Sequence, residues 1–144
     1  LLTPISYKGV KSTQKAKDNL LAQMEKNSGK IEDIVEQSSK RYNQTWRDYR
    51  INLAYNSSIL EARIAYMNMY LNVDYESNFE KLEINIPIKI IIGKYDFPVF
   101  SKNEVAKYFE EFNDVEIVEF EEAGHYPMIE CPVLFASKIE FWAK

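Results

Sequence analysis

The chain of 144 residues contains few or none of the features that mark several common protein classes. A single cysteine, Cys131, excludes an internal disulfide framework and a cysteine-rich zinc site, so a reducing, cytoplasmic location is the default expectation. One histidine, with no clustered ligand spacing around Glu121 and Glu122, argues against a metal site. The net charge of −4 disfavours nucleic acid as a partner, and no apolar run approaches the length of a membrane span.

The first long zone of the chain, residues 11–83, is expected to be helical, because apolar side chains recur there at three- and four-residue steps. Ser12 or Thr13 can cap a first helix, and Gly29 is suited to end it. A stripe from Ile31 to Leu53 then predicts one long helix, or two helices broken near Ser38–Ser39.

A further helix is expected after that stripe. Asn56–Ser57 interrupts the apolar pattern, and Ser58 followed by Glu61 fits a capping box, in which each side chain satisfies a backbone N–H of the first turn.

The last zone, residues 84–144, alternates strand and helix patterns. A nearly continuous β-branched run over residues 88–92 predicts a buried parallel strand. Ser101 can cap the helix that follows, residues 115–120 predict a second strand, and Pro132 suits the first turn of a last helix. This order predicts parallel strands joined by a crossover, with any site beyond their carboxyl ends.

Asp96 and His125 each follow one of these strands and lie 125 − 96 = 29 residues apart. A histidine acts as a general base when one ring nitrogen faces a nucleophile and a carboxylate orients the other. Taken singly, Asp96 fits a turn residue and His125 fits an ordinary core or surface histidine. Their joint position after consecutive parallel strands favours a catalytic pair.

The end of the chain resembles the α/β-hydrolase superfamily. Ile86-Pro87-Ile88 through Gly93-x-x-Asp96 is similar to its penultimate strand and acid loop, and Ala123-Gly124-His125-Tyr126-Pro127 with Glu130-x-Pro132 is similar to its histidine loop and final helix. The resemblance covers roughly the last sixty residues.

This resemblance implies an α/β protein with a partial α/β-hydrolase fold. Residues 1–10 would be the end of a core strand and a loop, residues 11–83 a helical cap or lid, and residues 84–144 the C-terminal part of the core. Asp96 would be the acid and His125 the base of a nucleophile–histidine–acid triad. The parent enzyme would hydrolyse an ester, amide or related bond of a small-molecule substrate without a cofactor.

One part of the triad is absent from the sequence. The four glycines are Gly9, Gly29, Gly93 and Gly124, and none of them forms the Gly-x-Ser-x-Gly elbow that carries the nucleophile. We therefore expect the chain to be the C-terminal part of a larger enzyme, inactive without the missing N-terminal part. A sheet interrupted in this way would leave an exposed edge through which two copies of the chain could pair.

Several aromatic residues are candidates for the walls of a substrate pocket. Tyr95, Phe97 and Tyr126 flank the catalytic pair in sequence, and the helical zone adds Trp46, Tyr49, Tyr66, Met67 and Tyr70, which are otherwise plain core residues. Glu130 is expected to support the start of the last helix. Two alternatives stay open: a non-catalytic binding module with a helical aromatic face, and a complete small α/β domain with a fortuitous resemblance.

Overall fold

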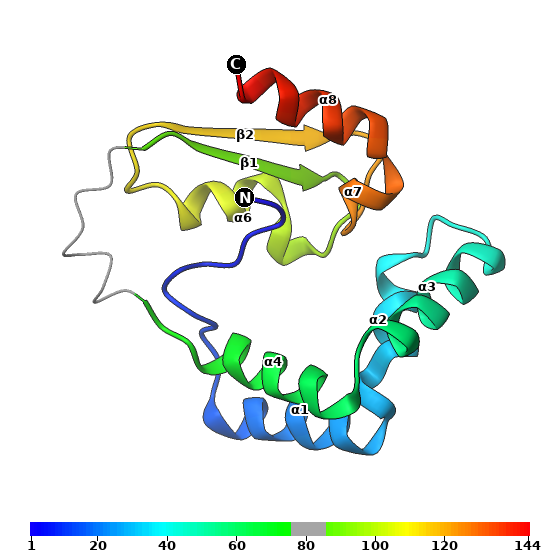
Figure 1. Cartoon of the computed structure of the whole chain (residues 1–144). Coiled ribbons are helices and arrows are strands. Elements are labelled where there is room, and N and C mark those ends of the chain that lie inside the picture. The colour runs from blue at the N-terminus through cyan, green and yellow to red at the C-terminus, as the bar shows by residue number, and fades with distance from the viewer. Residues whose placement is uncertain (76–85) are drawn as a thin grey trace. The chain divides into compact units, whose positions relative to one another are not determined.

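The computed structural model describes residues 1–75 and 86–144 of the chain. These residues form two units, one built from Leu1–Tyr7 with the described part of Glu76–Lys144, and the other from Lys8–Tyr75 (Figure 1). The predicted junction between the helical zone and the C-terminal zone, at residues 83 and 84, lies outside the described residues.

The first unit is organised by two parallel strands. β1 (Ile88–Gly93) pairs with β2 (Val115–Phe120) in parallel, from Ile88 opposite Val115 to Gly93 opposite Phe120. The predicted strands and their parallel pairing are confirmed. Along the edge of β1 that does not pair with β2, Leu2 forms a parallel bridge with Ile91. The N–H of Ile91 donates to the carbonyl oxygen of Leu1 at 3.0 Å. β1 is therefore the central strand of this unit.

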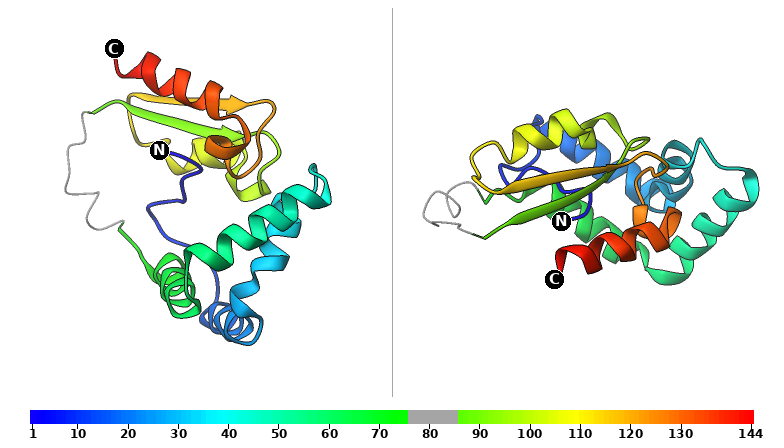
Figure 2. Two further views of the ribbon diagram at one scale, coloured as in Figure 1. Left: turned by 45° about the vertical axis from the view of Figure 1, so that its right-hand side comes forward. Right: turned by 90° about the horizontal axis from the view of Figure 1, so that it is seen from above.

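Helices cover the two faces of this sheet. α6 (Lys102–Tyr108) and α8 (Pro132–Trp142) lie on opposite sides of it, as Figure 2 shows. Because side chains alternate along a strand, Ile90 and Ile92 pack on the α6 side, whereas Ile91 packs on the α8 side. This explains why β1 is an almost unbroken isoleucine run: both of its faces are buried.

Two one-turn helices were not expected from the sequence. η2 (Pro98–Phe100) follows the loop after β1, and α7 (Pro127–Glu130) follows the loop after β2. Each begins with a proline, whose fixed φ suits the first helical position. Neither is long enough to produce a helical periodicity, so the sequence pattern could not reveal them.

The second unit contains four α-helices: α1 (Gln14–Lys26), α2 (Ile31–Ser38), α3 (Gln44–Ser57) and α4 (Leu60–Asn72). α1 packs against α4, and α2 packs against α3 (Figure 1). Thr13 caps α1 as expected, and its hydroxyl accepts from the N–H of Ala16. Gly29 lies in η1 (Ser28–Lys30) with φ of 79°, a left-handed conformation that favours glycine.

The apolar stripe of this unit corresponds to two helices, because the chain breaks after Ser38 and resumes at Asn43, which caps α3. α3 ends at Ser57, within the predicted break at Asn56–Ser57. One detail of the prediction was wrong: Ser58 forms no capping box. The Ser58 hydroxyl donates instead to the carbonyl oxygen of Ala54, and Arg63 donates to Ser58. A local hydrogen bond to the preceding helix thus replaces the cap.

Candidate active site

The carboxyl end of β1 delivers Asp96 through a tight turn. Ile90, Ile91 and Ile92 are almost completely buried, which fixes the end of the strand from which the loop departs. The N–H of Asp96 donates to the carbonyl oxygen of Gly93 at 3.2 Å, closing the turn. The carboxylate of Asp96 points inward, and its side chain is only 1 % exposed.

The carboxyl end of β2 delivers His125 to the same place. Nδ1 of His125 lies 2.8 Å from Oδ1 of Asp96, and this oxygen also accepts from the N–H of Phe97 at 2.6 Å. Because an ionised carboxylate can only accept, Nδ1 of a neutral His125 must carry the proton, which leaves Nε2 as an acceptor. The structure therefore brings together the two residues predicted to form an acid–base pair.

The other oxygen of Asp96 has a different environment. Oδ2 is buried and has no hydrogen-bond partner among the described residues. Leaving a buried acceptor without a donor costs free energy. The surrounding loop, and not a complete set of hydrogen bonds, therefore holds this carboxylate in place.

Three aromatic rings surround the imidazole. The ring centroids of Phe97, Phe100 and Tyr126 lie 5.4, 5.1 and 4.9 Å from that of His125. Phe97 and Tyr126 were predicted to flank the pair. Phe100 was missed, because it belongs to η2, and a phenylalanine four residues after an acid carries no specific signal in the sequence. Tyr95 is half exposed and contributes its backbone N–H, which donates to the carbonyl oxygen of Ala123 at 3.0 Å.

Close backbone packing locks the acid loop to the histidine loop. A Cβ atom added to Gly93 would lie 2.6 Å from the carbonyl oxygen of Ala123 and still closer to that of Gly124. Only glycine leaves room for this approach. This close approach and the hydrogen bond from Tyr95 to Ala123 fix the positions of the Asp96 loop and the His125 loop relative to each other.

Glu130 was expected to support the start of the last helix, and this was wrong. α8 begins at Pro132 with Cys131 as its N-cap residue, whereas Glu130 ends α7. Its carboxylate accepts instead from the N–H groups of Gly124 and Tyr126, on either side of His125.

The five predicted pocket residues of the helical zone belong to the second unit. Trp46 lies on α3, and its ring packs at a tilt against those of Tyr42 and Tyr49, with centroid distances of 4.9 and 5.8 Å. Tyr66, Met67 and Tyr70 lie on α4, where Tyr66 is largely exposed. Their role in a substrate pocket stays a prediction.

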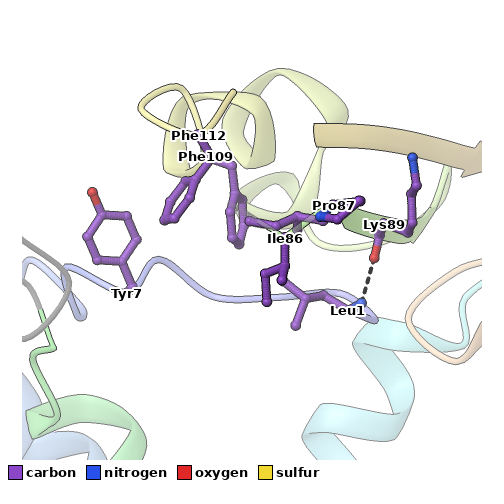
Figure 3. A pocket seen from close by; sticks show the side chains of 8 residues that line it. Leu1, Tyr7, Ile86, Pro87, Lys89, Phe109 and Phe112 are labelled. Atoms are coloured by element: carbon purple, nitrogen blue, oxygen red, sulfur yellow. Dashed lines mark hydrogen bonds between the residues drawn. The ribbon is translucent and has the colours of Figure 1, made fainter. Parts of the chain in front are cut away.

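A pocket of about 360 Å³ lies at the opposite end of β1 from Asp96. Figure 3 shows its walls, which are mainly apolar: Leu1, Tyr7, Ile86, Pro87, Ile88, Lys89, Phe109 and Phe112. None of the predicted site residues lines it, so it is separate from the acid–base pair.

Residues 1–75 and 86–144 show neither a metal-binding cluster nor a membrane-spanning helix. No cluster of three or more histidine, cysteine, aspartate or glutamate side chains is arranged to hold a metal ion there. None of the helices in these ranges combines the length and apolar character needed to cross a membrane.

Comparison with solved structures identifies the fold. An esterase from Exiguobacterium antarcticum matches 90% of this chain with a TM-score of 0.70 and 17% identity, and the match covers 48% of the esterase. An α/β hydrolase enzyme from a Medee basin deep-sea metagenome library matches 99% of this chain with a TM-score of 0.66 and 17% identity, over 55% of its own length. A thermophilic esterase matches 83% of this chain with a TM-score of 0.56 and 18% identity, over 48% of its length.

These matches show that the chain has a partial α/β-hydrolase fold, as expected from its acid and histidine loops. The chain spans about half the length of the solved structures that it matches. No protein-family model and no curated protein sequence matches it.

Proposed function

We propose that this chain supplies the acid and the general base of a serine-type α/β-hydrolase that cleaves an ester, amide or related bond of a small-molecule substrate. The observation that carries the proposal is the 2.8 Å contact between Nδ1 of His125 and Oδ1 of Asp96 at the carboxyl ends of parallel strands. The esterases among the structurally similar proteins support the same reaction class.

The geometry of the pair suits proton transfer. Nε2 of His125 accepts the proton of an attacking hydroxyl, and Asp96 stabilises the imidazolium that forms. Phe97, Phe100 and Tyr126 cover the imidazole with apolar surface. Because the Asp96 side chain is only 1 % exposed, its attraction to the imidazolium is stronger than it would be in solvent.

The nucleophile and the oxyanion donors belong, in this proposal, to a polypeptide segment outside the 144 residues. No serine lies in a Gly-x-Ser-x-Gly elbow, and the chain matches about half of each similar structure. That segment, the missing N-terminal part of the same enzyme, is thus the partner we propose. Without it the base has nothing to deprotonate and the developing negative charge has no donors, so the chain alone should be inactive.

A second candidate function is a binding module. It is favoured by the large apolar side chains that the second unit exposes: Ile59 is 67 % and Tyr66 is 66 % exposed. In that case Asp96 and His125 would be remnants of a catalytic site.

The test compares the 144-residue chain with the product of its complete open reading frame, using p-nitrophenyl butyrate hydrolysis and labelling by a fluorophosphonate. We expect neither reaction from the chain alone. We expect both from a product that includes the nucleophile segment, with hydrolysis reduced at least about 1,000-fold by His125→Ala or by Asp96→Asn. A complete product with no elbow serine and no labelling would favour the binding module, and hydrolysis that survives His125→Ala would exclude the proposed base.

A further inference from the structure

We infer that Glu130 is a positioning residue for His125, an inference that rests on the proposed function. The carboxylate of Glu130 spans the histidine: Oε2 accepts from the N–H of Gly124 at 2.6 Å, and Oε1 accepts from the N–H of Tyr126 at 3.0 Å. One side chain therefore fixes the peptide unit that follows His125 and the one that precedes Gly124.

One of the two hydrogen bonds has an ordinary structural explanation. Tyr126 is the N-cap residue of α7, and a glutamate that reaches back to the N–H of an N-cap residue stabilises the first turn of a helix. A bond to Tyr126 alone would thus indicate only a capping role.

The second hydrogen bond goes beyond capping. Gly124 precedes the N-cap residue by two positions and is not part of α7. Hydrogen bonds to an ionised acceptor are stronger than neutral ones, and this one is short. By holding the chain before His125 as well as after it, Glu130 restricts the backbone dihedrals of the histidine itself.

The direction of the imidazole follows from this restriction. The bond from the N–H of Tyr95 to the carbonyl oxygen of Ala123 anchors the loop to the acid side of the site, and Glu130 anchors it from the α7 side. Pro127, which is almost completely buried, fixes the start of the turn from which Glu130 reaches back. His125 therefore faces Asp96 through Nδ1 even before any substrate or nucleophile is present.

Glu130→Gln is the sharpest variant for this inference. The amide keeps the shape of the side chain, but it has one acceptor oxygen and places an NH₂ group against the second backbone N–H. Only one of the two bonds can survive. Glu121→Gln is the matched control, because it removes the same charge from the segment after β2, where Glu121 pairs with Lys94 and both side chains are well exposed.

The single histidine of the chain makes the readout direct. Proton–nitrogen correlation spectra of the imidazole report which nitrogen carries the proton and how fast that proton exchanges with water. We expect the unmodified chain and Glu121→Gln to show the Nδ1–H tautomer with a slowly exchanging proton. In Glu130→Gln we expect this proton to exchange at least about tenfold faster and the Nε2–H tautomer to appear.

The following outcomes would contradict the positioning role of Glu130. An unchanged tautomer and exchange rate in Glu130→Gln would mean that Glu130 does not position the ring. If the unmodified chain lacks the Nδ1–H tautomer, the proposed acid–base pair itself fails. If the unmodified chain shows this tautomer and Glu130→Gln leaves it unchanged, only the role of Glu130 fails. Glu130→Asp is the second variant: it keeps the charge, but is too short to bridge both N–H groups and should behave like Glu130→Gln. Loss of the dispersed backbone signals of β1 and β2 in both variants would assign Glu130 a purely structural role.

Discussion

Gly93→Ala and Gly124→Ala form a matched pair of substitutions that tests the packing between the acid loop and the histidine loop. The new Cβ at position 93 would collide with the carbonyl oxygens of Ala123 and Gly124, which are backbone atoms and cannot move independently. At position 124 the nearest atoms are the carboxylate oxygens of Glu130 at 3.4 Å, which is an ordinary van der Waals distance.

The expected cost follows from these distances. Overpacking of this kind costs about 1–3 kcal/mol, and separating the loops would also break the bond from Tyr95 to Ala123, at about 1 kcal/mol. We therefore expect Gly93→Ala to lower the free energy of unfolding of the first unit by about 2–4 kcal/mol. For Gly124→Ala we expect a change below about 1 kcal/mol.

The two tryptophans of the chain permit a unit-specific assay. Trp46 belongs to the second unit and Trp142 to the first, where its Nε1–H donates to Glu116 at 3.0 Å. In a Trp46→Phe background, urea unfolding followed by Trp142 fluorescence reports the first unit, and the midpoints of the two variants can be compared at constant slope. Unfolding free energies within about 0.5 kcal/mol of each other would refute the reasoning, because surface substitutions away from such contacts have effects of that size.

Two further predictions concern the first unit. The hydrogen bond from Lys138 holds the pKa of Glu116 below its ordinary value of 4.5, so this carboxylate stabilises the fold above that pH, and the contribution is lost as the pH falls through the lowered pKa. Glu116→Gln should therefore be less stable than the unmodified chain above pH 4.5 and nearly equal to it at strongly acidic pH; a pH-independent difference in Trp142-monitored melts would contradict this. We also propose that the open sheet edge lets two copies of the chain pair, so sedimentation should show a concentration-dependent dimer, and a strictly monomeric chain would count against this pairing.

The sequence predicted the sheet and the acid–base pair because both depend on strong local signals. The isoleucine run of β1 indicates a strand buried on both faces, and parallel strands place the residues that follow them at one edge. Asp96 and His125 were accessible to this reasoning even though 29 residues separate them.

The details that escaped prediction depend on tertiary contacts. Phe100 reaches His125 because the one-turn helix η2 turns the chain from Pro98 to Phe100. A single helical turn is too short to show a helical periodicity of apolar residues in the sequence. Glu130 was expected to support the start of the last helix, but it ends the one-turn helix α7, and its carboxylate accepts from the histidine loop. Ser58 had the sequence of a capping residue, but the carbonyl oxygen of Ala54 and the guanidinium of Arg63 bind its hydroxyl instead.

The most direct measurement of the central claim is the tautomer of His125 with and without its carboxylate partner. Asp96→Asn keeps an acceptor for the N–H of Phe97 but removes the charge that selects the proton on Nδ1. If Asp96 orients the imidazole, proton–nitrogen spectra should show the Nδ1–H tautomer in the unmodified chain and a shift towards Nε2–H in the variant. The same tautomer mixture in both proteins would contradict the account.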